Sequence, residues 1–408
     1  MGRAWLVAAM EIVPPMRVFR PLLAALVLLT TTACMATGDA PIPMATGTTT
    51  AASCAAPAAP APSDVALERM IGQLLVVGFS GSSSGSASAA AVRDDLAAGR
   101  VGGVLFLRHN VSSAANVKRL AADFQAASGS TPALLMIDQE GGKVQRLTAS
   151  MGFPSTPSAA YVAKHYSPGE AQTLYRKMAD ALKAWGFNVN LAPVADVAVN
   201  PANPVIAKAD RAFSSDPAVV AAYDEAFVKA HRAAGVAASL KHFPGHGSSA
   251  GDSHNGAVDI TKTWSKAELI PYRTLISDGV ADLIMVGHLR LARPGYGDTL
   301  PASISPAVIQ GLLRDQLCFK GVVMTDDLIM RAIRNRMSAV DAVVAALKAG
   351  NDIAVVSGDG STGSDFPQKA IAAVAAAAAE DPAFRQSLAQ SYARVMALKR
   401  KVGAPTGL

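Results

Sequence analysis

Short apolar stretches recur along most of the chain. They are separated by longer segments, in which apolar residues recur every three or four positions. The short stretches are rich in β-branched residues and nearly free of polar ones, which is typical of strands buried on both faces. We expect eight strands, at residues 74–79, 101–107, 133–138, 187–194, 236–242, 281–288, 321–327 and 352–357. The intervening segments carry Ala, Leu, Lys and Glu at helical spacing, for example at residues 114–128, 168–185, 216–234, 265–279, 306–316 and 338–349.

Strands that alternate with helices in this way predict a parallel sheet. Eight strand–helix units within about 300 residues favour a closed (β/α)8 TIM-type barrel over an open doubly wound sheet. No Gly-x-Gly-x-x-Gly motif follows the first expected strand, which counts against a dinucleotide-binding fold. We therefore expect residues 64–408 to form a single catalytic domain of the α/β class.

Polar residues gather at one end of the expected strands. Six of the eight strands end in charged or polar residues, namely Arg108 and His109, Asp138 with Gln139 and Glu140, Asp196, Lys241 and His242, His288, and Asp326 and Asp327. The first residues of the strands are mostly apolar or small, whereas exposure to solvent alone would place polar residues at both ends. Because barrel enzymes carry their catalytic residues at the carboxyl ends of the strands, the sequence predicts an active site there.

The composition indicates a globular domain with a modest charge. Hydrophobic residues make up 50% of the chain, and the formal net charge is +6. From Cys34 onward there are 34 basic and 30 acidic residues, and the basic ones are scattered, so we expect no nucleic-acid partner. The chain has neither a Cys-x-x-Cys nor a His-Glu-x-x-His motif, and we expect neither a metal site nor a cofactor.

Residues 1–34 have the layout of a bacterial secretion leader. Arg17 and Arg20 precede an apolar run at residues 22–29, and small residues follow as far as Cys34. The apolar run is too short to cross a bilayer stably. The ending resembles that of a lipoprotein leader, in which a lipid is attached to the cysteine. We expect lipidation at Cys34, or simple cleavage of the leader, and a monomer anchored to the membrane outside the cytoplasm.

The next segment, residues 35–63, consists mainly of Ala, Pro, Thr and Gly and predicts a disordered tether. Two further cysteines remain, Cys54 in the tether and Cys318 just before the seventh expected strand. In an oxidising compartment they can form a disulfide that holds the tether to the domain, or they can stay free. The sequence does not decide between these two states.

The loop after the fifth expected strand is the strongest candidate for chemistry. It runs from Lys241 through a Gly- and Ser-rich stretch to Asp252, Ser253 and His254. An Asp two residues from a His can orient the imidazole and stabilise its protonated form. A fixed carboxylate such as Asp326 opposite this pair suits acetal hydrolysis, in which one group attacks the anomeric carbon and another protonates the leaving oxygen. The alternative is that Asp326 pairs with a lysine as part of the barrel structure.

Five motifs in this order resemble family 3 glycoside hydrolases, in particular the bacterial β-N-acetylglucosaminidase (NagZ) branch. They are Asp138-Gln139-Glu140-Gly141-Gly142-Lys143-Val144-Gln145-Arg146, Leu191-Ala192-Pro193-Val194-Ala195-Asp196, Lys241-His242-Phe243-Pro244-Gly245-His246-Gly247, Asp252-Ser253-His254 and Thr325-Asp326-Asp327-Leu328. The resemblance extends from about residue 65 to the end of the chain. The sequence departs from the family pattern at Asp210, where Gly is usual, and at residues 255–258, directly after His254.

The resemblance implies a retaining mechanism with Asp326 as the nucleophile and His254, held by Asp252, as the acid/base. It also implies a pocket that grips a non-reducing-end N-acetylglucosamine. The residues implied to bind this sugar are Asp138, Arg146, Arg211, Lys241 and His242, with Asp196 and His288 nearby. The expected partners are cell-wall fragments that contain N-acetylglucosamine, and no cofactor is implied.

The sequence leaves three other functions open. Because a neutral imidazole repels an incoming anion less than a carboxylate does, phosphate rather than water could accept the glycosyl group. The departures at Asp210 and residues 255–258 leave room for a sugar-binding lipoprotein without activity. A β-glucosidase or β-xylosidase would share the barrel and the nucleophile but would be expected to lack the pair of Asp252 and His254.

Overall fold

The computed structural model describes Cys54 and residues 66–358 and 362–403. The expected leader at residues 1–34, its Cys34 and all of the expected tether except Cys54 lie outside the described residues. None of the described helices is both long and apolar enough to cross a bilayer.

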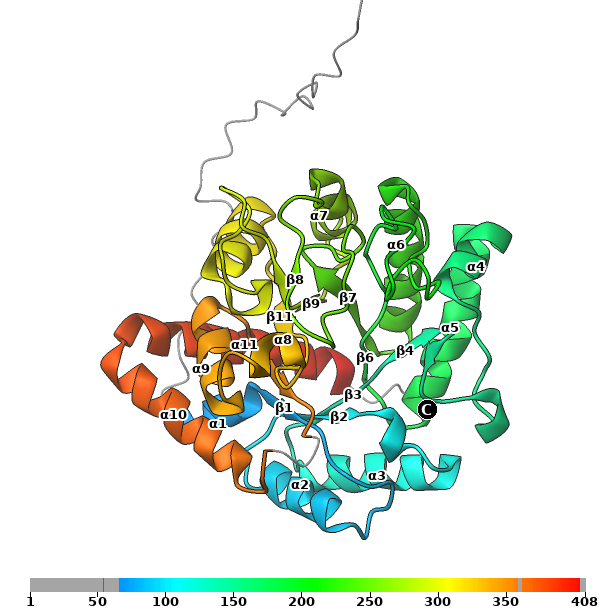
Figure 1. Cartoon of the computed structure of the whole chain (residues 1–408). Helices are drawn as coiled ribbons and strands as arrows, with labels where there is room; N and C mark the ends of the chain where they lie inside the picture. The colour runs from blue at the N-terminus through cyan, green and yellow to red at the C-terminus, as the bar shows by residue number, and fades with distance from the viewer. Residues whose placement is uncertain (1–53, 55–65, 359–361, 404–408) are drawn as a thin grey trace, which may run out of the picture. The chain divides into compact units, whose positions relative to one another are not determined.

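Eight parallel strands form the centre of the domain and confirm the expected TIM-type barrel (Figure 1). They are β1 (Leu75–Val77), β2 (Gly103–Phe106), β3 (Leu134–Ile137), β6 (Val189–Asn190), β7 (Ala237–Phe243), β9 (Leu283–Val286), β11 (Val322–Thr325) and β12 (Ala354–Val356). Their spatial order is β11-β9-β7-β6-β3-β2-β1-β12. A parallel bridge between Met324 and Ile353 joins the two ends of this order and closes the barrel.

Seven of the eight strands fall within the expected ranges, and β7 extends one residue beyond the expected 236–242, to Phe243. In contrast, β6 is much shorter than residues 187–194. Pro193 has no N–H to donate, so regular pairing stops before it. Beyond it a single bridge joins Val194 to Lys241 of β7. Within the described residues, four further strands lie outside the barrel sheet: β4 (Gln139–Gly141) pairs with β5 (Val144–Gln145), and β8 (Val258–Asp259) pairs with β10 (Leu289–Arg290).

Helices surround the strands (Figure 1). They are α1 (Leu67–Gln73), α2 (Ala87–Ala97), α3 (Ala114–Ala127), α4 (Ala159–His165), α5 (Pro168–Ala184), α6 (Pro217–Ala233), α7 (Ile270–Ser277), α8 (Arg331–Arg334), α9 (Ala339–Ala349), α10 (Phe366–Glu380) and α11 (Pro382–Gly403). The expected helix at residues 306–316 is the π-helix η6 (Ala307–Gln316). The one expected at 265–279 begins as a 3-10 turn, η4 (Lys266–Leu269), and continues as α7. Pro271 lies in the first turn of α7, where its missing N–H removes no helical hydrogen bond.

The apolar strand residues and the inner helix faces form one continuous core. Within it, Phe106 on β2 makes edge-to-face contacts with Phe79, Phe124 and Phe187, at centroid distances of 5.1, 5.8 and 5.0 Å. Such contacts add to the free energy gained by burying the rings. This packing fixes the strands, and therefore the residues at their carboxyl ends.

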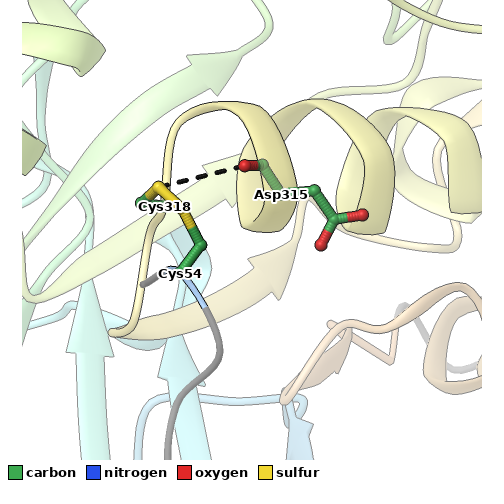
Figure 2. The surroundings of a disulfide bond; sticks show 3 residues. All are labelled: Cys54, Asp315 and Cys318. Atoms are coloured by element: carbon green, nitrogen blue, oxygen red, sulfur yellow. Dashed lines mark hydrogen bonds between the residues drawn. A yellow bond between two sulfur atoms is a disulfide. The ribbon is translucent and has the colours of Figure 1, made fainter. Parts of the chain in front are cut away.

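Cys54 and Cys318 are joined by a disulfide, with their Cα atoms 4.9 Å apart (Figure 2). Cys318 lies between η6 and β11, next to Asp315 at the end of η6. It therefore precedes β11, at the end of the barrel opposite to the carboxyl ends of the strands. The bond fixes one point of the expected tether at that end.

Removing this disulfide is expected to destabilise the domain. The bond closes a sequence separation of 264 residues, and such a cross-link lowers the conformational entropy of the unfolded chain. We expect Cys54→Ala to lower the free energy of unfolding by about 2–4 kcal/mol, measured by denaturant unfolding. Wild type in reductant is the control and should match the variant. Equal stability of oxidised wild type and Cys54→Ala would contradict the expectation.

Candidate active site

A cavity of ≈ 340 Å³ opens at the carboxyl ends of the barrel strands. Its lining comes from segments on or just after β2, β3, β6, β7, β9, β11 and β12, from the β4–β5 pair and from two longer loops. The lining residues that carry charge or an imidazole are Asp138, Glu140, Arg146, Arg211, Lys241, His242, His254, Asp326 and Asp327. Seven of the ten residues expected at the site therefore line one cavity.

Five charged side chains form a connected network on one side of the cavity. Lys241 on β7 donates to Asp138 at 2.8 Å and to Glu140 at 2.7 Å. Arg146 donates to the other oxygen of Asp138 at 3.0 Å. Arg211 makes two parallel hydrogen bonds to Glu140, both 2.8 Å long. The planar guanidinium group matches both carboxylate oxygens, so this pair is fixed in orientation as well as in distance.

The network is ionised at neutral pH. Burial favours the neutral acid, but the positive charges of Lys241 and Arg146 hold the pKa of Asp138 well below its usual range. The pKa of Glu140 is likewise lowered, to about 2, because the charges of Arg211 and Lys241 outweigh the effect of burial. Two carboxylates and three cations leave this wall of the cavity with a net positive charge. Such fixed charges can make strong, oriented hydrogen bonds to sugar hydroxyls.

Removing Lys241 is expected to destabilise the fold, because two buried carboxylates would lose their shared cation. We expect Lys241→Met to cost about 3–5 kcal/mol of unfolding free energy at pH 7, measured in urea. The exposed Lys143, which pairs with Asp210 at the surface, is the matched control, and Lys143→Met should cost less than about 1 kcal/mol. Equal effects of the two substitutions would contradict the expectation.

The same network gives a pH dependence of stability. The folded-state pKa of Glu140, about 2, lies below its ordinary value of 4.5. Its contribution to stability is therefore complete above pH 4.5 and is lost as the pH falls toward 2. We expect wild-type stability to fall across this window, and the fall to be smaller in Lys241→Met, as measured by urea unfolding at each pH.

Asp326 follows β11 directly, and its carboxylate lines the cavity. The N–H of Asp327 donates to its Oδ1 at 2.8 Å. Burial alone would raise the pKa of Asp326, but His288, His242 and His254 lower it below its ordinary value. The group is therefore an ionised carboxylate held in a fixed orientation, as a nucleophile requires.

His254 lines the same cavity and lies on the loop that follows β7. Its Nδ1 bonds to Oδ1 of Asp252 at 2.7 Å, and its main-chain N–H donates to the same oxygen at 2.9 Å. Partial burial would raise the pKa of Asp252, but these hydrogen bonds to His254 lower it below its ordinary value. Because an ionised carboxylate only accepts, Nδ1 carries a proton and Nε2 remains for proton transfer. The imidazole is 63% exposed, so solvent can reach it.

Three expected site residues lie outside the cavity wall. Asp252 bonds to His254, which does line the cavity. Asp196 is fully buried and accepts from Nδ1 of His242 at 2.7 Å, so it orients a residue that does line the cavity. His288 is also buried, and its ring bonds to Ser303 and to the main-chain oxygen of Asp327. Asp196 and His288 thus lie behind the cavity wall and bond to the protein, and their expected place near the sugar stays a prediction.

Two residues of the site were not singled out as site residues from the sequence. Glu140 joins Lys241 to Arg211, and Asp327 lines the cavity beside Asp326. Burial raises the pKa of Asp327 to about 6. Both residues belong to motifs on which the resemblance rests. The motifs could therefore have pointed to them as site residues, although the sequence did not indicate which residues they contact. Among the described residues, no three His, Cys, Asp or Glu side chains group as a metal site.

A closed parallel barrel with a charged cavity at the carboxyl ends of its strands defines a protein of the TIM-barrel class. Residues 66–398 match the glycosyl hydrolase family 3 N-terminal domain. The chain belongs to this family.

Relatives of known name agree with this assignment. Beta-hexosaminidase LpqI of Mycobacterium tuberculosis is 40% identical over 242 residues, which cover 57% of this chain and 61% of that protein. Beta-hexosaminidase of Xylella fastidiosa strain M23 is 36% identical over 292 residues, 69% of this chain and 83% of that protein. The crystal structure of the beta-N-acetylhexosaminidase from Beutenbergia cavernae DSM 12333 superposes with a TM-score of 0.75 at 32% identity, covering 83% of this chain and 99% of that one. The chain thus spans less than two thirds of the mycobacterial relative.

Proposed function

We propose that this protein is a retaining exo-β-N-acetylglucosaminidase. The observation that carries the proposal is that the ionised Asp326 and the Asp252-held imidazole of His254 line one cavity. The volume of that cavity lies near the lower end of the range for small-molecule sites, which suits one sugar unit rather than a long glycan. The names of the relatives, beta-hexosaminidase and beta-N-acetylhexosaminidase, support the same substrate class.

The reaction takes two steps. First, a carboxylate oxygen of Asp326 attacks the anomeric carbon while Nε2–H of His254 protonates the departing glycosidic oxygen, giving a glycosyl–Asp326 ester. Second, Nε2 takes a proton from water, the water oxygen attacks the anomeric carbon, and the ester bond to Asp326 breaks. Asp252 stabilises the imidazolium form that the first step needs. The charged network around Lys241 holds the sugar during both steps.

We propose muropeptide fragments of the cell wall as the natural substrate and a lipid on Cys34 as the membrane anchor. The Cys54–Cys318 disulfide supports this arrangement, because disulfides persist in oxidising compartments outside the cytoplasm. The bond lies at the end of the barrel opposite the cavity. We propose that the protein acts as a monomer.

Phosphate is a second candidate acceptor. The wall around Lys241 carries a net positive charge, and the acid/base is an imidazole rather than a carboxylate, so neither would repel an anion. Phosphorolysis would use the same nucleophile and the same acid/base.

A steady-state assay tests the proposal. Wild type is expected to release N-acetylglucosamine from a nitrophenyl N-acetyl-β-glucosaminide, with the β-anomer formed first by NMR, and to leave the corresponding glucoside unchanged. Adding phosphate shows the acceptor, because phosphorolysis gives N-acetylglucosamine 1-phosphate. Binding of N-acetylglucosamine without turnover would instead identify a non-catalytic sugar-binding protein, and preferred turnover of the glucoside would identify a β-glucosidase.

A further inference from the structure

The loop that carries His254 rests on two buried carboxylates. Oδ1 of Asp196 accepts the N–H of His246 at 2.7 Å. Oε2 of Glu268 accepts the next two N–H groups, those of Gly247 at 2.9 Å and Ser248 at 3.3 Å. Three successive main-chain donors of the loop therefore bind carboxylate oxygens. Hydrogen bonds of this kind to an ionised acceptor are roughly twice as strong as neutral ones.

The loop also fits closely against Glu268 and its surroundings. Gly245 has a φ of +121°, and a Cβ there would lie 2.6 Å from the Cβ of Glu268. A Cβ on Gly247 would lie 1.6 Å from the main-chain oxygen of Val197. On the other side, Asn203 donates to the main-chain oxygen of His246 at 2.8 Å. The first half of the loop is thus held from both sides, and His254 follows seven residues after Gly247.

We propose that Glu268 is a positioning residue for the acid/base: its ionised carboxylate holds the loop so that His254 lies in the cavity. This inference rests on the proposed glycosidase function. Glu268 comes from η4, outside the barrel strands, and does not line the cavity. It therefore acts only through the main chain of the loop.

The surroundings of Glu268 make its charge sensitive to pH. Its side chain is fully buried, and its Oε1 makes no hydrogen bond within the described residues. Burial, together with the negative charge of Asp196, raises the pKa of Glu268 to about 7, although the donors at Ser248 and Gly247 oppose the shift. Tyr272 on α7 is a further titratable group near it, and burial raises the pKa of this tyrosine well above the ordinary value.

The hold on the loop should therefore weaken as the pH falls below about 7. A protonated carboxyl group accepts the N–H groups of Gly247 and Ser248 less strongly. The residues that would grip the sugar, such as Asp138 and Lys241, lie on or directly after strands and are not held by Glu268. We expect kcat to fall on the acid side near pH 7 while KM stays nearly constant.

Glu268→Gln tests this inference, because it keeps the size of the side chain and removes its charge. We expect kcat at pH 8 to fall roughly 10- to 100-fold, with little change in KM and with loss of the acid limb near pH 7. Glu380→Gln, at an exposed position on α10, is the matched control and should behave as wild type. Wild-type kcat and an unchanged acid limb in Glu268→Gln would overturn the inference. An acid limb that disappears only in Asp327→Asn would do the same.

A second measurement does not depend on turnover. At pH 8, amide hydrogen exchange of residues 246–256 should be faster in Glu268→Gln than in wild type, and the difference should shrink at pH 6. Equal exchange at pH 8 would overturn the inference even if the enzyme is active. Faster exchange in a protein whose wild type hydrolyses no glycoside would support the hold on the loop and overturn the proposed function alone.

Discussion

Replacing Asp326 by Asn is expected to lower kcat for an N-acetyl-β-glucosaminide by roughly 10⁴-fold or more, because the group that forms the covalent intermediate is lost. The ionised state of this carboxylate supports the role: burial would raise its pKa, but three histidines lower it below the ordinary value. The charged network around Lys241, which we propose to hold the sugar, does not include Asp326, so binding of N-acetylglucosamine should survive the substitution.

Asp94→Asn, at an exposed position on α2, is the control for Asp326→Asn and should leave kcat unchanged. Thermal unfolding of both variants would establish that they are folded. An Asp326→Asn enzyme that is folded and turns over at more than about one hundredth of the wild-type rate would contradict the assignment of the nucleophile.

Replacing His254 by Ala is expected to lower kcat by about 10²- to 10⁴-fold, with an effect that depends on the leaving group. A nitrophenolate departs without protonation, so the first step should survive better for that substrate than for a disaccharide. The second step still needs a base to activate water. We therefore expect a burst of nitrophenol followed by slow turnover, and recovery of turnover when azide, which needs no base, is added.

His165→Ala, on the exposed side of α4, controls for the loss of an imidazole and should have no effect. Asp252→Asn keeps the size of the residue that orients His254 but removes its charge, so it should give a smaller loss in the same direction. Equal losses for nitrophenyl and disaccharide substrates in His254→Ala, without recovery in azide, would contradict the acid/base assignment.

Local patterns in the sequence predict the barrel and most of the cavity wall. Each strand is a continuous apolar run, and it can be recognised in the sequence without knowing which strands lie beside it. Closure of the barrel then brings the strand ends together. Asp138, Lys241 and Asp326 therefore line the same cavity, although they lie far apart in the sequence. The resemblance to family 3 added the roles that residue types alone left open.

The side-chain contacts that the sequence did not predict depend on the paths of the loops between the strands. Glu140 meets Arg211 across a separation of 71 residues, and nothing near either residue indicates the other. The resemblance to family 3 placed Asp196 and His288 near the sugar, but their bonds to His242, to Ser303 and to the main chain of Asp327 could not be predicted from the sequence. Glu268 resembles any acidic residue in the first turn of a helix, and only the path of the loop after β7 places two N–H groups on its carboxylate.

Trapping the covalent intermediate tests the proposed site most directly. Incubation with a fluorinated N-acetylglucosaminyl fluoride, which forms the glycosyl–enzyme quickly and releases it slowly, should raise the intact mass by one glycosyl group. Peptide mapping by mass spectrometry should then place the added mass on Asp326, and Asp326→Asn should not be labelled. A label on another residue, or an active wild type that forms no adduct and releases the α-anomer first, would contradict the assignment of Asp326 and His254 to opposite sides of the reacting sugar.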